Sequence, residues 1–242
     1  MLNLDAIANG VMQEYPYHWI FFDNLIPKQE LFELLNTFEY DKYREQFRCR
    51  MILDQGAKVL PNVKKFYDAV KNKYYINPSP KLSSVWQTLV DELVSLPYRE
   101  AVAKLTGLNL ERQIIRISLS QLDSTVNKDL APHKDSWFIN NRDSGMALTH
   151  LFYFSEDWKS EWGGSLQILE NEQHESVFQD IPPQLGNSVL FLCEHNAWHV
   201  VSPISPLAPR PRQHLMVRFY DQQVYLKYLW EGENCTYLSL GI

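Results

Sequence analysis

The sequence predicts an α+β protein, mainly β, in which a helical N-terminal layer packs against a C-terminal barrel made of two sheets. The period of the hydrophobic pattern changes near residue 110, from helical spacing before it to a spacing close to two after it. The second part contains seven short runs rich in Val, Ile, Leu, Phe and Tyr, separated by clusters of Asn, Asp, Gly, Pro and Ser. Runs of this kind at short spacing are typical of a sandwich or barrel.

No internal repeat or long polar linker divides the chain, so we expect one domain over residues 1–242. It consists of a helical layer (about 1–110), a barrel core (about 111–221) and a C-terminal tail (222–242) whose structure the pattern does not predict. The net charge of −6 argues against nucleic-acid binding and against binding to an anionic membrane surface, both of which favour basic proteins. The chain begins without a basic, apolar leader, and its three scattered cysteines suggest reduced thiols. We therefore expect a cytoplasmic protein.

The N-terminal layer has signals for both strand and helix. The predicted elements are a strand within 18–26 and helices over 28–38, 82–96 and 99–107. Leucines at helical spacing follow Pro27, and Ser83 or Ser84 is suited to cap the second helix. Pro97 is expected to end that helix, and Gly107 to end the third.

The C-terminal half contains the barrel strands. They are predicted at 114–122, 147–154, 165–170, 176–181, 188–193, 198–204 and 213–220. In the last of them, alternation gives a core face of Leu215, Val217 and Phe219. The opposite face has Arg212, His214, Met216 and Arg218. Arginine and histidine on that face indicate either a wet cavity or plain solvent.

Two short motifs could bind a metal. In an extended segment His133 and Asp135 point to the same side, although for this pair alone a solvated turn after Pro132 is the simpler explanation. His199 begins a strand about 65 residues later and could add a second imidazole. Two histidines and one carboxylate form the facial set that binds Fe(II) and leaves positions open for substrate and oxygen.

Five motifs, in the right order, give a family resemblance. Residues 113–221 resemble the prolyl-4-hydroxylase-like branch of the Fe(II)/2-oxoglutarate dioxygenases. The matching segments are His133-Lys134-Asp135 (H-x-D), Leu148–Phe154 (T-x-x-x-Y-L), Trp162–Leu166 (G-G-x-L), His199–Pro203 (H-x-V-x-P) and Arg212–Asp221 (R-x-x-x-x-x-W-[FY]). The resemblance implies a double-stranded β-helix, a jelly-roll or cupin-like barrel. It also implies Fe(II), 2-oxoglutarate and O₂ as cofactor and cosubstrates, with ascorbate as an optional reductant.

The resemblance also implies roles for individual residues. His133, Asp135 and His199 would bind Fe(II), and Arg212 would pair with the distal carboxylate of 2-oxoglutarate. Arg210 is a rival for that role, but counting back from Phe219-Tyr220-Asp221 favours Arg212. The remaining cosubstrate positions would be Tyr153, Thr149, Leu151 and Leu166. His214 shares a face with Arg212 and is a candidate to support it. His150 lies on the face of its own strand opposite Thr149 and Tyr153 and is expected to pack.

The implied reaction is hydroxylation of an unactivated C–H bond, with release of succinate and CO₂. Asp at position 135 fills the coordination site that halogenases leave for chloride, which favours hydroxylation over halogenation. The chain departs from the family at Asp123, where a tyrosine is common, and at Arg218, where protein-directed prolyl hydroxylases tend to have Trp. We expect Arg218 to meet an anionic group of the substrate, with Trp137 and Gln121 as further substrate positions.

Three functions remain open at this stage. The first is a hydroxylase of a small molecule, such as an amino acid or a biosynthetic metabolite, which the short acidic chain and Arg218 favour. The second is a protein hydroxylase acting on a prolyl or other residue, because the motifs match that branch. The third is a barrel that binds a ligand without turnover, against which the complete set of His133, Asp135, His199 and Arg212 argues.

Overall fold

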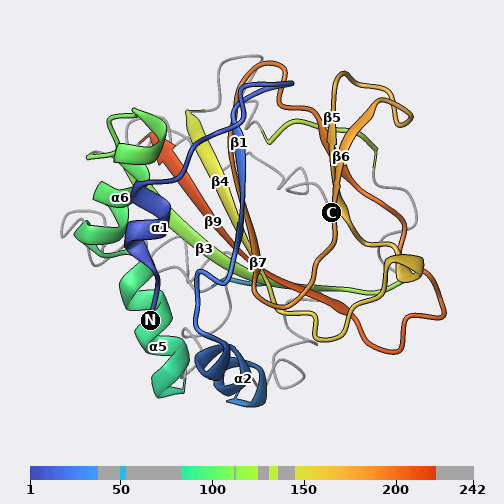
Figure 1. The fold of residues 1–242 in the computed structure, drawn as a ribbon, viewed down its shortest axis with the longest axis horizontal. Helices are drawn as coiled ribbons and strands as arrows, with labels where there is room; N and C mark the ends of the chain where they lie inside the picture. Colours follow the sequence, from blue (N-terminus) through green and yellow to red (C-terminus); the bar gives the residue numbers. More distant parts are fainter. Residues whose placement is uncertain (38–49, 53–82, 112, 125–130, 136–144, 222–242) are drawn as a thin grey trace, which may run out of the picture.

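Two antiparallel sheets form the centre of the computed structural model, and helices cover one of them (Figure 1). The structure describes residues 1–37, 50–52, 83–111, 113–124, 131–135 and 145–221. The larger sheet has the strand order β1-β7-β4-β9-β3-β2, and the smaller sheet the order β6-β5-β8. Together they form the jelly-roll barrel that the motifs implied. No helix in the described part of the chain is long and apolar enough to cross a membrane.

The N-terminal layer contains the predicted strand and three helices, with one correction, and adds a short helix and a short strand that the sequence did not predict. Its elements are α1 (Leu4–Ala8), β1 (Trp19–Asp23), α2 (Lys28–Thr37), β2 (Arg50–Ile52), α5 (Ser84–Leu93) and α6 (Leu96–Thr106). Ser83 caps α5 through its side chain, and Gly107 ends α6 in the left-handed conformation at φ 70°. Pro97 does not end α5, as the sequence suggested, but lies in the first turn of α6. Proline is tolerated there because the first turn has no intrahelical acceptor for its missing N–H.

All seven predicted barrel strands are present. They are β3 (Gln113–Leu122), β4 (Met146–Tyr153), β5 (Leu166–Leu169), β6 (Val177–Ile181), β7 (Asn187–Leu192), β8 (His199–Val201) and β9 (Arg212–Asp221). β9 lies between β3 and β4 and pairs with both in antiparallel register. Both faces of β9 are buried because the helical layer packs on one side of the larger sheet and the smaller sheet on the other. The tail at 222–242 and the predicted substrate position Trp137 lie outside the described residues.

Alternation along the central strands separates two cores. On the helix side, Leu215, Val217 and Phe219 of β9 pack with buried residues of α5 and α6. On the barrel side, Met216 of β9 packs with residues of both sheets, including Tyr153, Leu166 and Phe191. The face of β9 that carries Arg212 and His214 is therefore buried in the barrel and not exposed to solvent.

Candidate metal and cosubstrate site

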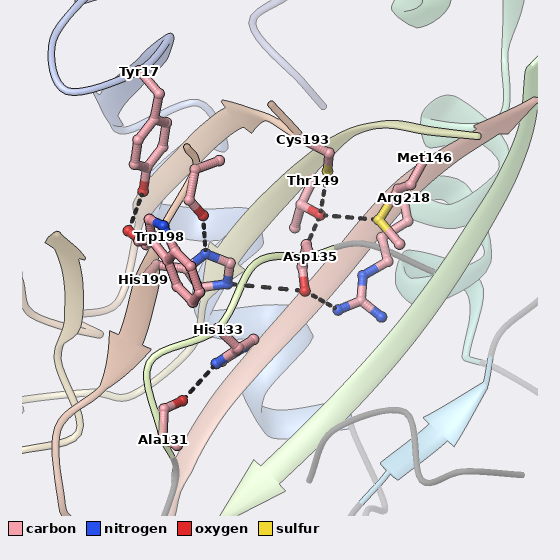
Figure 2. A network of polar contacts seen from close by, with 11 residues as sticks. Tyr17, Ala131, His133, Asp135, Met146, Thr149, Cys193, Trp198, His199 and Arg218 are labelled. Carbon is pink, nitrogen blue, oxygen red and sulfur yellow. Dashed lines mark hydrogen bonds and ion pairs between the residues drawn. The ribbon is translucent and has the colours of Figure 1, made fainter. Parts of the chain in front are cut away.

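His133, Asp135 and His199 come together at the start of β8, whose first residue is His199 (Figure 2). One potential ligand atom from each residue lies within 4.8 Å of the others. Residue 133 forms an isolated antiparallel bridge with His199, and the two backbones exchange hydrogen bonds of 2.9 Å in both directions. Because the backbone joins segments that lie over sixty residues apart, the histidine pair does not depend on side-chain contacts alone.

The two imidazoles are held in the same way. His133 Nδ1 lies 3.0 Å from the carbonyl oxygen of Ala131, and His199 Nδ1 lies 3.0 Å from that of Ala197. A carbonyl oxygen only accepts, so each Nδ1 carries the proton and donates it. In the neutral form of each ring, Nε2 keeps the lone pair that ligates a metal. Burial is the main reason that the pKa of His199 falls to about 4, so this imidazole is neutral at pH 7.

Asp135 is buried and held on both carboxylate oxygens. Its Oδ2 accepts a 2.7 Å hydrogen bond from Thr149 Oγ1, and its Oδ1 accepts one of 3.0 Å from Arg218 Nη2. Oδ1 also lies 3.9 Å from His199 Nε2. Burial alone would raise the pKa of Asp135, but the Arg218 charge, the two histidines and the Thr149 hydrogen bond lower it below the ordinary value. The carboxylate is therefore ionised at pH 7.

Lys134, between the two ligand candidates, points away from them. Its Nζ donates a 2.9 Å hydrogen bond to the carbonyl of His195 and lies 4.7 Å from the centre of the Trp198 ring. Both contacts join the segment 133–135 to the loop before β8. No pattern in the sequence indicates this role for Lys134.

Arg212 is almost completely buried, with 1% of its surface exposed. Its Nε donates a 2.7 Å hydrogen bond to the carbonyl of Gly164, and its Nη1 lies 2.7 Å from His214 Nδ1. The guanidinium also sits 5.1 Å from the centre of the Tyr153 ring. The rival Arg210 is exposed and pairs with Glu156 at the surface. The structure thus places Arg212 inside the barrel and Arg210 outside it.

Gly163 and Gly164 follow the short 3₁₀ turn Ser160–Trp162, and the carbonyl of Gly164 serves Arg212. Both have positive φ, 65° and 72°. A Cβ at Gly163 would lie 2.0 Å from the carbonyl oxygen of Pro203, and one at Gly164 would lie 3.3 Å from Arg212 Cδ. Close approach as well as φ therefore requires glycine at 163, whereas at 164 it is mainly the positive φ that favours glycine. The role of the Gly164 carbonyl as an acceptor for Arg212 was not apparent from the motif.

The other predicted site residues have different surroundings. Leu151, Tyr153 and Leu166 are buried in the barrel-side core. The Tyr153 hydroxyl is buried and has no hydrogen-bond partner among the described residues. Thr149 contacts Asp135 and so lies at the metal ligands. Gln121 lies on β3 and accepts a hydrogen bond from Gln213 on the neighbouring strand.

Two other histidines are not part of the triad, and one of them, His150, was expected to pack. His150 faces the helix side, where it contacts Tyr98 and Ser188. His195 is exposed on the loop before β8. His214, which the sequence offered as a support for Arg212, contacts that residue directly.

The arrangement fits a divalent metal together with a small dicarboxylate. Two imidazoles and one ionised carboxylate make a mixed N and O donor set that suits Fe(II) and leaves coordination positions open. The buried Arg212 and the unpartnered hydroxyl of Tyr153 together offer donors to an anion. A buried arginine normally has an anionic partner, and a guanidinium binds a carboxylate through two parallel hydrogen bonds.

Comparisons with known proteins agree with this geometry. Residues 119–219 match the model of the 2OG-Fe(II) oxygenase superfamily. A prolyl-4-hydroxylase of Pseudomonas putida is similar in structure, with a TM-score of 0.56, 16% identity and coverage of 90% of this chain and 96% of that one. A prolyl 4-hydroxylase of Phytophthora capsici gives a TM-score of 0.53 at 16% identity and covers 91% of this chain and 62% of that one.

A third structure of the same fold comes from a virus. The viral collagen prolyl hydroxylase of Paramecium Bursaria Chlorella virus-1 gives a TM-score of 0.50 at 10% identity, covering 83% of this chain and 87% of that one. No curated protein sequence matches the chain. At such low identities the structural likeness shows the fold, and the oxygenase assignment depends on the matched segment 119–219 and the residues within it.

Proposed function

We propose that this chain, which belongs to the 2OG-Fe(II) oxygenase superfamily, hydroxylates a small molecule that carries a negative charge. As a member of that superfamily it is a dioxygenase that uses Fe(II), 2-oxoglutarate and O₂. The observation that supports the proposal is the His133, Asp135 and His199 cluster with Arg218 beside it.

Each residue has a defined part in this proposal. His133, Asp135 and His199 would hold Fe(II), which with 2-oxoglutarate and O₂ supplies the oxidising chemistry while succinate and CO₂ are released. Arg212 and Tyr153 would bind the distal carboxylate of 2-oxoglutarate inside the barrel. Thr149 keeps Asp135 oriented through its hydrogen bond to Oδ2. Leu151 and Leu166 would wall the cosubstrate site and exclude water, which strengthens the polar contacts within it.

The charge of the site supports an anionic substrate. Asp135 is the carboxylate of the triad, and Arg218 already balances its charge. Fe(II) and doubly negative 2-oxoglutarate would balance each other, and Arg212 would then leave these groups with a net positive charge. Prolyl hydroxylases that act on proteins tend to have Trp at the position of Arg218, which would leave the same set neutral. The added arginine therefore favours a carboxylate or a similar anion near the iron.

A second candidate is hydroxylation of a prolyl or other residue in a peptide. Structures named as prolyl hydroxylases share the fold at TM-scores of 0.56 and 0.53. The two candidates differ in the size and charge of the substrate that they require, and Gln121 and Trp137 remain the predicted substrate positions.

The class of chemistry is tested first by an anaerobic titration. Fe(II) added with 2-oxoglutarate should produce the weak visible charge-transfer band of a chelated keto acid, and Fe(II) alone should not. Asp135→Ala and Arg212→Ala should weaken the band, whereas Arg210→Ala is the matched arginine control and should leave it unchanged. Absence of the band in folded protein would contradict the proposal and indicate a barrel that binds without turnover.

The substrate class is tested by succinate release. The wild-type protein is assayed with free amino acids and other small carboxylates, with their amides or esters, and with proline-containing peptides. We expect the carboxylates to stimulate release more than their neutral derivatives, and Arg218→Met to reduce that difference. Stimulation by peptides alone would favour the second candidate, and equal stimulation by charged and neutral forms would contradict a role for Arg218 in substrate choice.

A further inference from the structure

His214 lies two residues beyond Arg212 on β9, so the two side chains are on the same face of the strand. Its Nδ1 is 2.7 Å from Arg212 Nη1, and both side chains are buried in the barrel. We propose that His214 is a positioning residue that holds the Arg212 guanidinium in the orientation that receives 2-oxoglutarate. This inference rests on the proposed role of Arg212 at the cosubstrate.

The contact fixes the protonation state of His214. A guanidinium has five N–H donors and no acceptor, so His214 Nδ1 must be the acceptor. The imidazole is therefore neutral and carries its proton on Nε2. Here the histidine acts as an acceptor for a cation, which an apolar side chain of similar size cannot do.

Two contacts together determine how the guanidinium is turned. Gly164 accepts from Nε and His214 accepts from Nη1, so the planar group is held at two of its three nitrogens. A planar group fixed at two atoms cannot rotate about its last bond without breaking one hydrogen bond. The donors beyond these two contacts are then presented in a fixed direction, as bidentate binding of a carboxylate requires.

The neighbouring strands restrict His214 itself. Tyr153 on β4 and Ser120 on β3 lie opposite it in the register, and the Tyr153 ring centre is 6.4 Å from that of the imidazole. Tyr153 also lies against the Arg212 guanidinium. Arg212, His214 and Tyr153 therefore form one buried cluster in which a change at His214 reaches the cosubstrate groups directly.

The test compares two substitutions that differ in one property. His214→Asn keeps an acceptor close to the position of Nδ1, whereas His214→Leu removes it. Binding of 2-oxoglutarate to the Mn(II)-loaded protein, measured by calorimetry, should weaken by roughly ten-fold or more in His214→Leu, because a buried charged donor loses its acceptor. It should stay within about three-fold of wild type in His214→Asn, since a buried neutral hydrogen bond is retained. His174→Asn changes an exposed histidine in the same way and should have no effect.

Further measurements separate positioning from general damage. The affinity for Mn(II) alone should be the same in all variants, and in turnover His214→Leu should raise the KM for 2-oxoglutarate with a much smaller change in kcat. In an Arg212→Lys background the substitution His214→Leu should add little to the loss of binding, because His214 acts through the guanidinium. Wild-type affinity in His214→Leu, or equal losses in the Leu and Asn variants, would overturn the inference. If Arg212→Lys itself binds 2-oxoglutarate as wild type does, the proposed function fails first.

Discussion

The two faces of the central strands bury different kinds of side chain. On the helix side, Leu215, Val217 and Phe219 of β9 are fully buried against apolar side chains of the helical layer. On the barrel side, the same strand buries Arg212 and His214 and places Arg218 against Asp135. Apolar residues need only a partner of suitable shape, whereas each buried polar group needs a partner of suitable chemistry. The barrel side is therefore the face whose buried polar groups can select a metal or ligand by its chemistry.

His150 and His199 make this contrast within one residue type. His150 Nε2 lies 2.7 Å from Ser188 Oγ, and its Nδ1 lies 2.8 Å from the Tyr98 hydroxyl. Ser188 donates its proton to the carbonyl of Leu151, so His150 Nε2 donates to Ser188 and Nδ1 accepts from Tyr98. Both ring nitrogens are thus used. His199 uses only Nδ1 in this way and turns Nε2 toward Asp135. The packing histidine therefore has both ring nitrogens in hydrogen bonds, whereas the histidine of the metal-ligand cluster keeps one nitrogen for a ligand.

The largest effect is expected from loss of a triad ligand. Asp135→Ala should reduce affinity for Fe(II) or Mn(II) by more than about 100-fold, beyond the range found when only a partner of a ligand is removed. Calorimetry of metal binding measures the loss. His195→Ala, on the exposed loop nearby, is the matched control and should bind metal normally. Equal metal affinity in Asp135→Ala and wild type would contradict the assignment of metal binding to the barrel side of the sheet.

The next effect concerns the turn below Arg212. Gly163→Ala should lower the free energy of unfolding by more than about 3 kcal/mol, because a new Cβ would collide with the backbone at Pro203. Gly107→Ala at the end of α6 has a similar φ but open space around it. It should cost only about 1 kcal/mol, the penalty of the left-handed conformation. Denaturant unfolding of the two variants provides the comparison, and similar losses would contradict the close approach.

A smaller effect is expected at the hydrogen bond to Asp135. Thr149→Val keeps the shape of the side chain but removes the donor to Oδ2. Metal affinity should fall by roughly 10- to 100-fold, the usual result of losing a partner of a ligand. Leu215→Ala on the opposite face is the counterpart: it should cost about 2–5 kcal/mol of stability while folded protein keeps its metal affinity. A reversed pattern, with Leu215→Ala alone weakening metal binding, would show that the faces are not separable.

The smallest effect is a pH dependence of stability from His150. Burial lowers its pKa to about 3, so it stays neutral in the folded chain while the unfolded chain binds a proton below about pH 6.5. Its contribution to stability is complete above that value and declines as the pH falls toward 3, by up to about 1.4 kcal/mol per pH unit. Urea unfolding between pH 7 and 5 should show a shallower pH dependence in His150→Leu than in wild type. Parallel curves would mean that His150 takes up a proton in the folded state.

Much of the fold was predictable from the sequence. Period-two runs identified the strands, because a half-buried strand must alternate its side chains. The same rule assigned Leu215, Val217 and Phe219 to one face of β9 and Arg212, His214 and Arg218 to the other. Pro97 was misjudged because proline can begin a helix as well as end one, and only the boundary between α5 and α6 decides which.

The sequence by itself determined the residue types of the site and their order along the chain, through motifs such as His133-Lys134-Asp135 and Arg212–Asp221. Only the tertiary structure decided which of them meet. Arg218 pairs with Asp135 across 83 residues, and Gly164 with Arg212 across 48. Such partners are fixed by sheet register and turn geometry, which leave no periodic signal in a single sequence. The identity of each hydrogen-bond partner therefore depends on the packed barrel, even though the groups that need partners are visible in the chain.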